Sequence, residues 1–158
     1  MMRGEHKMTF QTRQFGNIEF NLEKGIVFPE GIPGFEMLKK FIIIEDQDTN
    51  SPFRYLQSIE DGDITFVLTN PHELFPSYAP KIPEIYFEKI GGGDTEDFML
   101  LAIVAIPQEV KEATVNLQAP ILFQVNTRQA IQVILEDKTY QTRHKLLDLM
   151  GNAGEEIC

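Results

Sequence analysis

The chain has few of the residues that build disulfide frameworks or metal centres. Its 158 residues include one cysteine, Cys158, three histidines and no tryptophan. A single thiol cannot form a bridge within the chain, and a chain of this length buries enough apolar surface to fold without one. No stretch approaches the roughly 18 apolar residues of a membrane span, and the opening MMRGEHKM lacks the apolar run of a secretory signal. We therefore expect a cytoplasmic protein that does not enter a membrane.

Catalytic and metal-binding motifs are also missing. None of the histidines has a cysteine or a second histidine at metal-ligand spacing, and no serine lies in a G-x-S-x-G turn. The run Gly91-Gly92-Gly93-Asp94 lacks the Lys-Ser/Thr pair of a phosphate-binding loop. We predict no catalytic residue, no cofactor and no metal. An enzyme that uses paired carboxylates stays an alternative, because a sequence does not show how far apart two carboxylates lie.

Basic residues are scarce, with 14 Lys and Arg against 24 Asp and Glu, for a formal net charge of -10. The excess is concentrated in residues 48–112, which hold 4 basic and 12 acidic side chains. Such a chain would repel nucleic acid and attract basic partners, although acidity also serves solubility alone. The acidic clusters at 60–63 and 94–97 lack the ligand order of an EF-hand, so we predict solvated turns there.

What the sequence does contain is many short β-type segments. Apolar residues alternate with polar ones or form short β-branched runs between turn-forming residues. This pattern predicts strands at Thr9–Phe15, Ile18–Asn21, Gly25–Phe28, Lys40–Glu45, Arg54–Ser58, Ile64–Thr69, Phe98–Ile106, Ala113–Gln118, Ile121–Asn126 and Ala130–Glu136. We predict a mostly β, single-domain antiparallel β-barrel-like fold over residues 1–150, with a disordered C-terminal tail at 151–158.

Only two segments look helical. Four prolines make residues 70–97 mostly loop, but Pro83 fits the first turn of a short helix that ends near Ile90, before Gly91. Residues 142–150, TRHKLLDLM, group their leucines loosely, and we expect a frayed terminal helix there. The fold should therefore contain one or two short helices.

The stretch FPEGIPGFE, residues 28–36, is a corner built from two prolines and two glycines. Ile32-Pro33-Gly34-Phe35 fits a type II turn, in which Pro33 supplies the fixed φ of the second position and Gly34 the positive φ of the third. We expect the apolar residues of the corner to plug one end of the barrel. Recognition by another protein stays a second hypothesis for this corner.

In NLQAPILFQVN, residues 116–126, Pro120 interrupts what would otherwise be one continuous strand. A proline at this place predicts an edge strand or a bulge, because proline has no amide hydrogen for the ladder. Two interpretations stay open: the break leaves backbone groups free for a partner, or it forms a barrel corner that binds nothing.

Four stretches in this order resemble the FliW flagellar assembly factor family. They are FPEGIPGFE at 28–36, PFRYLQS at 52–58, FVLTNPHELFPSY at 66–78 and NLQAPILFQVNTRQAIQVIL at 116–135, and together they span most of residues 9–140. The resemblance implies a small, barrel-like cytoplasmic protein without enzymatic activity. It implies binding of newly made flagellin, and sequestration of CsrA, a basic dimeric RNA-binding regulator that represses translation of flagellin message. Flagellin that accumulates would displace CsrA, and flagellin export would free the protein to sequester CsrA again.

The acidic surface suits such a partner switch. Docked on a basic RNA-binding protein, it would cancel positive potential and repel phosphates, and we assign this role to Asp61, Asp63, Asp94 and Asp97. The resemblance implies that flagellin presents amphipathic terminal helices before export, so we expect an apolar helix-in-groove contact. No coiled-coil pattern or long apolar face indicates an obligate dimer, and we expect a monomer that does not itself bind nucleic acid.

The residues that we expect to contact partners lie on three segments. The proline-rich loop carries aromatic residues, PFRYLQS begins beside a turn, and the third segment flanks Pro120. The candidates are Phe53, Tyr55, Leu74, Phe75, Tyr78, Asn116, Gln118 and Ile121. For each aromatic residue, core packing is the competing explanation. The competing functions are a small-ligand-binding barrel, which requires an apolar cavity, and the carboxylate-dependent enzyme.

Overall fold

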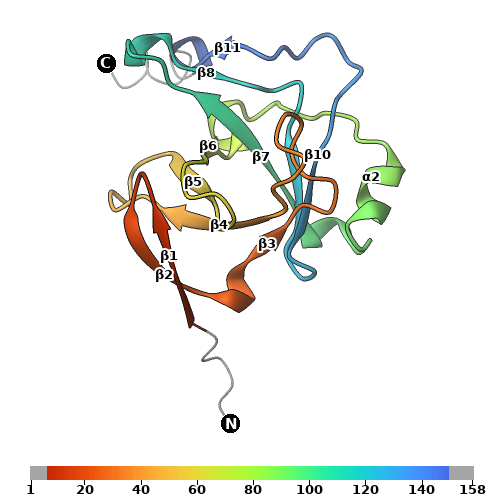
Figure 1. The fold of residues 1–158 in the computed structure, drawn as a ribbon. Coiled ribbons are helices and arrows are strands. Elements are labelled where there is room, and N and C mark those ends of the chain that lie inside the picture. The colour runs from red at the N-terminus through yellow and green to blue at the C-terminus, as the bar shows by residue number, and fades with distance from the viewer. Residues whose placement is uncertain (1–6, 150–158) are drawn as a thin grey trace.

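Residues 7–149 are described by a computed structural model (Figure 1). The strands are β1 (Lys7–Thr12), β2 (Gly16–Asn21), β3 (Ile26–Val27), β4 (Lys40–Glu45), β5 (Phe53–Ser58), β6 (Thr65–Thr69), β7 (Phe98–Ala105), β8 (Thr114–Val115), β9 (Ile121–Gln124), β10 (Gln129–Gln132) and β11 (His144–Lys145). The helices are α1 (Pro71–Leu74) and α2 (Glu84–Lys89), and the 3₁₀ turns are η1 (Leu22–Lys24), η2 (Thr95–Asp97) and η3 (Val110–Glu112). The tail predicted at 151–158 lies outside these residues.

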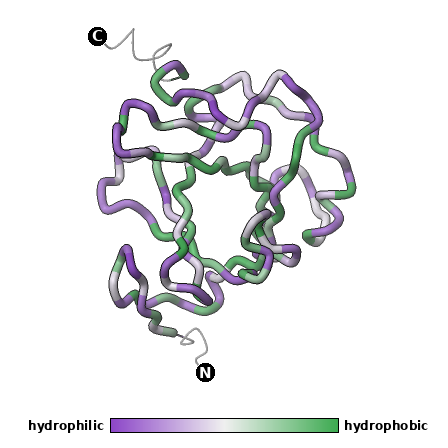
Figure 2. Tube along the Cα trace, turned by 45° about the horizontal axis from the view of Figure 1, so that its top comes forward, coloured by the Kyte–Doolittle hydropathy of each residue, from purple (hydrophilic) through white to green (hydrophobic). Residues whose placement is uncertain are grey.

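Seven strands close into a barrel. Around the ring their order is β7, β6, β5, β4, β3, β10 and β9, and the pairing of β9 with β7 closes it. All neighbours are antiparallel except β10 and β3, which run parallel with Gln129 opposite Val27. Figure 2 looks into the ring and shows mainly hydrophobic residues around it. The predicted mostly β, barrel-like fold is confirmed, with one parallel contact added.

Apolar side chains fill the inside of the barrel. Side chains alternate between the two faces of a strand, so on β4 Phe41 and Ile43 join the inner cluster while Ile42 does not. The inner cluster also contains Ile26, Phe28, Ile32, Leu56, Leu68, Leu101, Ile121, Phe123 and Ala130. The void at its centre measures about 10 Å³, which is the space of a single water molecule. The inner pocket that a small-ligand barrel requires is therefore filled.

Two further apolar clusters cover the outside of the barrel. One joins the outward face of β7 to β8, to Tyr78 and to Leu146. The other joins α2 to the outward faces of β9 and β10, through Ile90, Leu122 and Ile131. The predicted helix at 83–90 is confirmed as α2, with Pro83 as its N-cap residue. Helix α1 was not predicted, because its four residues lie inside a proline-rich segment.

Several predicted strands are shorter than expected, and two in the C-terminal part of the chain differ clearly from the prediction. The strand expected at Ala113–Gln118 is reduced to β8, because the Asn116 side-chain oxygen accepts hydrogen bonds from the backbone N–H groups of Gln118 and Ala119 at 3.1 and 3.0 Å and turns the chain. The strand expected at Ala130–Glu136 ends as β10 at Gln132. The region expected to be a terminal helix at 142–150 begins instead with β11, which pairs with β8, and is helical at 146–149.

The corner at 28–36 closes one end of the barrel. The Phe35 backbone N–H donates to the Ile32 carbonyl at 2.6 Å and Gly34 has a φ of +89°, as a type II turn requires. Phe28 and Ile32 are buried in the inner cluster, and Phe35 packs edge-to-face on Phe66 at 5.3 Å. The expected plug is confirmed for Phe28 and Ile32, whereas Phe35 stays partly exposed.

The barrel has a closed mouth and an open mouth. At the closed mouth β3 ends and β4 begins, and the 28–36 corner lies across it. At the opposite, open mouth β4, β6 and β9 end, while β3, β5, β7 and β10 begin. The β1–β2 hairpin and η1 stand beside the open mouth, where residues of β2 and η1 line the same groove as residues of β4, β5, β7 and β9.

Candidate partner-binding surfaces

The proline-rich segment around α1 is held by an aromatic cluster. Asn70 caps α1 by accepting a hydrogen bond from the His72 backbone N–H at 2.9 Å. Tyr78 is 1% exposed, and its hydroxyl donates to the Leu117 carbonyl at 2.6 Å. Burial raises the pKa of the Tyr78 phenol well above its usual range. Tyr78 thus anchors the segment and offers no surface to a partner, while Leu74 and Phe75 stay half-buried.

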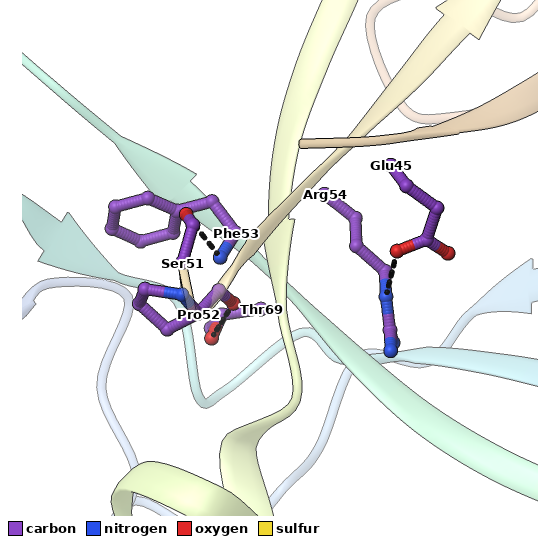
Figure 3. A network of polar contacts seen from close by, with 6 residues as sticks. All are labelled: Glu45, Ser51, Pro52, Phe53, Arg54 and Thr69. Atoms are coloured by element: carbon purple, nitrogen blue, oxygen red, sulfur yellow. Dashed lines mark hydrogen bonds and ion pairs between the residues drawn. The ribbon is translucent and has the colours of Figure 1, made fainter. Parts of the chain in front are cut away.

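Phe53 and Tyr55 lie on the outward face of β5. Phe53 packs beside the outer cluster under β7 and β8. Figure 3 shows its backbone N–H, which donates to the Ser51 hydroxyl at 3.2 Å, and the Thr69 hydroxyl, which donates to the Pro52 carbonyl at 2.9 Å. Tyr55 donates its hydroxyl to Asp46 at 3.2 Å and packs edge-to-face on Phe15 at 5.3 Å. Both side chains are half-buried, so each holds neighbouring elements together and exposes part of its ring.

Backbone groups on both sides of the break at Pro120 are hydrogen-bonded within the protein. The Val133 backbone N–H donates to the Pro120 carbonyl at 2.8 Å, and Leu135 donates to the Gln118 carbonyl at 2.9 Å. Ile121 is 1% exposed and belongs to the inner cluster, so it cannot contact a partner in this conformation. The Asn116 side chain is engaged in its own turn. These contacts favour the barrel-corner interpretation over free backbone groups for a partner.

The four predicted acidic residues do not gather into one patch. Asp61 and Asp63 lie on the exposed turn between β5 and β6, and the pairing of Val67 with Val104 places this turn toward the C-terminal end of β7. Asp94 and Asp97 precede the N-terminal end of β7. Asp97 also accepts hydrogen bonds from the Asn126 amide at 3.0 Å and the Asp94 backbone N–H at 2.9 Å.

A different acidic surface was missed in the sequence. A hollow of about 220 Å³ beside the β4–β5 turn and α1 is lined by four carboxylates, Glu45, Asp46, Asp48 and Glu73. Arg54 is the one basic residue in its lining, and its Nε pairs with Glu45 at 3.2 Å (Figure 3). The cluster EDQD at 45–48 is visible in the sequence, but Glu73 joins it only through the pairing of β5 with β6.

The open mouth carries the largest hollow among those described here. A groove of about 590 Å³ runs between the β1–β2 hairpin with η1 and the ends of β4, β5, β7 and β9. Ile43, Met99 and Phe123 from the inward face form part of its floor. Its rim includes Lys24 and Arg54 from the first third of the chain and Arg128, which lies more than 70 residues after Arg54 in the sequence. No short motif could have indicated this site.

The described ranges show no sign of a metal centre or a membrane span. Within residues 7–149, no three His, Cys, Asp or Glu side chains are placed to hold a metal ion. No helix there is long and apolar enough to cross a membrane. The glycine run at 91–93 is tied to the β9–β10 turn, since Gln124 donates to the Gly92 carbonyl at 2.7 Å and Thr127 to the Ile90 carbonyl at 2.8 Å.

Comparison with known proteins decides the family. The model of the family described as FliW protein matches residues 9–146. The chain belongs to the FliW family. It is 40% identical to the flagellar assembly factor FliW of Alkaliphilus metalliredigens over 149 residues, covering 94% of this chain and 92% of the relative. It is 42% identical to the FliW of Caldicellulosiruptor saccharolyticus over 146 residues, covering 92% and 95%.

A solved FliW structure has the same fold. The crystal structure of a flagellar assembly factor FliW superposes with a TM-score of 0.81 at 33% identity, covering 88% of this chain and 96% of the other. The resemblance seen in the four sequence stretches is therefore confirmed. The relatives are named for flagellar assembly, and their names specify no reaction.

Proposed function

We propose that this FliW-family chain is a non-enzymatic flagellar assembly factor that binds newly made flagellin and sequesters the RNA-binding regulator CsrA in the cytoplasm. The observation that supports CsrA binding is the acidic excess, with 12 acidic and 4 basic side chains in residues 48–112. Family membership supplies the flagellar setting. Flagellin and CsrA would compete for the protein, so that flagellin synthesis follows export.

Electrostatics explain how such a chain would antagonise an RNA-binding protein. RNA phosphates bind through Lys and Arg, so an acidic protein docked on the same partner lowers the positive potential that the RNA requires. Three acidic regions can contribute. They are the turn with Asp61 and Asp63, the segment with Asp94 and Asp97, and the hollow lined by Glu45, Asp46, Asp48 and Glu73. Long-range attraction of this kind is screened by salt, with a Debye length of about 10 Å at 0.1 M.

The proposal that the protein binds flagellin rests on apolar surface that remains partly exposed. Leu74 and Phe75 are half-buried at the end of α1. A groove of about 290 Å³ between α1 and α2, lined by His72, Phe87 and Leu100 among others, lies on the same side of β7. An amphipathic helix binds such grooves through apolar residues on one face.

The test measures binding of purified flagellin and CsrA by titration calorimetry at about 50 and 500 mM salt, which brackets strong and weak screening. CsrA binding should weaken at high salt, and flagellin binding should change less. Two fourfold variants with the same charge change compare the acidic surfaces: Asp61, Asp63, Asp94 and Asp97 to Asn, and Glu45, Asp46, Asp48 and Glu73 to their amides. At least one should reduce the inhibition of RNA binding. Unchanged inhibition with both variants would remove the electrostatic explanation.

A further inference from the structure

The open mouth concentrates cations in an acidic protein. Lys24, Arg54 and Arg128 line its groove together with only two carboxylates, Glu19 and Glu45. The lining therefore has one more positive than negative side chain, whereas the whole chain has a net charge of -10. A ligand with a negative group would meet a more favourable potential at this place than the net charge of the chain indicates.

Arg128 has a left-handed backbone conformation, which is unfavourable for a residue with a Cβ atom. Within residues 7–149 it is the one non-glycine residue with positive φ, at +59°, in the β9–β10 turn where glycine or asparagine would be unstrained. Its guanidinium lies 5.2 Å from the centre of the Phe123 ring, and Nη2 donates to the Lys24 carbonyl at 2.6 Å and Nε to the Gly25 carbonyl at 3.4 Å. These bonds use two of its five N–H groups. Strain of this kind marks places where the side chain has a use.

Arg54 is only partly engaged as well. Its side chain is 39% exposed and pairs with Glu45 through Nε alone, at 3.2 Å. Figure 3 shows the rest of the guanidinium extending away from Glu45. In the part of the chain that the structure describes, no hydrogen bond or ion pair joins its terminal amino groups to another residue. A single guanidinium can bind a carboxylate through two parallel hydrogen bonds, and this groove has two guanidinium groups with N–H donors left over.

The floor of the groove determines which part of a ligand can bind below its negative group. Ile43, Met99, Leu101 and Phe123 line the same groove as the cations and supply its apolar surface, and the Arg128 guanidinium lies over the Phe123 ring. The barrel beneath is packed to a void of about 10 Å³, so the groove does not continue into a tunnel that could hold a long acyl chain. The floor can receive a few apolar side chains from a segment that lies across the mouth.

We propose that the open mouth of the barrel binds an acidic amphipathic segment of flagellin, with apolar side chains on the floor and a carboxylate on Arg54 and Arg128. This inference rests on the proposed function for the identity of the partner. It adds the open mouth as a second contact surface for flagellin, besides the apolar surface at α1 around Leu74 and Phe75.

The test uses the full chain and two kinds of probe. The first probe is full-length flagellin. The second is a set of fluorescein-labelled peptides of about 25 residues, or about seven helical turns, that cover the terminal segments of flagellin. Binding is followed by fluorescence anisotropy. The variants are Arg54→Gln and Arg128→Gly, the second of which relieves the positive φ and should keep the fold. Lys89→Gln is the matched control, because it removes one surface cation that pairs with Glu30 of the closed-mouth corner.

One acidic peptide should bind, and each groove variant should weaken it about tenfold, as loss of a charge-assisted hydrogen bond does. Lys89→Gln should stay within about twofold, and the same peptide with its acidic side chains amidated should lose affinity as the groove variants do. If flagellin binds wild type and both groove variants equally, the site is elsewhere and only this inference fails. If wild type binds no flagellin, the proposed function fails too. If sodium laurate binds in an Arg54-dependent way and no peptide does, the groove is a fatty-acid site and the proposal is wrong.

Discussion

The two glycines of the 28–36 corner allow backbone strain and steric overlap to be measured separately. Both have positive φ, +71° at Gly31 and +89° at Gly34. A methyl group added at Gly34 would meet nothing within 4 Å, whereas one added at Gly31 would lie 2.7 Å from both the Cα and the carbonyl oxygen of Glu36. The Glu36 atoms belong to the backbone and cannot rotate away.

The magnitudes follow from these distances. Left-handed backbone costs an alanine about 1–2 kcal/mol, and the reduced entropy of the unfolded chain offsets about 0.4–1 kcal/mol of this. Gly34→Ala should therefore lower the free energy of unfolding by about 1 kcal/mol. Gly31→Ala adds an overlap worth about 1–3 kcal/mol, giving about 2–4 kcal/mol in total. For a chain of this size, each kcal/mol lowers the melting temperature by about 2–4 °C.

Urea unfolding followed by far-UV circular dichroism is the suitable assay, because the chain has no tryptophan to report by fluorescence. The m-value should stay constant across wild type and both variants, so that the midpoints compare directly. Equal destabilisation by the two substitutions, or a smaller effect at Gly31, would show that overlap with the Glu36 backbone does not hold this corner in place.

Two further predictions concern hydrogen-bonded polar side chains. Tyr78→Phe removes the donor to the Leu117 carbonyl and should cost about 1–2 kcal/mol in urea unfolding, whereas Tyr140→Phe, whose hydroxyl accepts only a 3.3 Å bond from the Ala79 backbone N–H, should cost less. Equal effects would contradict this. His144 accepts a hydrogen bond from the Gln141 backbone N–H at 2.8 Å through Nε2, and burial lowers its pKa below the usual 6.5. Its contribution to stability should be complete above pH 6.5 and decline as the pH falls toward the folded-state pKa, because the unfolded chain takes up the proton first. Melting temperatures at pH 5–7 should show this decline in wild type and lose it in His144→Gln, and an unchanged slope would refute the assignment.

Local chemistry made most of the barrel predictable. The apolar, β-branched run at Lys40–Glu45 became β4 and the segment Arg54–Ser58 became the main part of β5, because short runs of β-branched and aromatic residues between turn-forming residues favour strands. The type II turn at residues 32–35 followed from the backbone preferences of Pro33 and Gly34 alone. The roles of individual aromatic residues were less accessible, since Tyr78 turned out to be buried, whereas Phe75 is partly exposed four residues after α1 begins.

The sequence by itself determined the local elements, the acidic balance and the family, since these depend on residue order and count. Only the tertiary structure decided which mouth of the barrel is closed, which acidic groups share a surface, and that Lys24, Arg54 and Arg128 meet around one groove. The physical reason is ring closure. The pairing of β9 with β7 closes the ring, and the pairing of β10 with β3 joins residues about a hundred positions apart, such as Gln129 and Val27. No local sequence pattern indicates that these residues are neighbours.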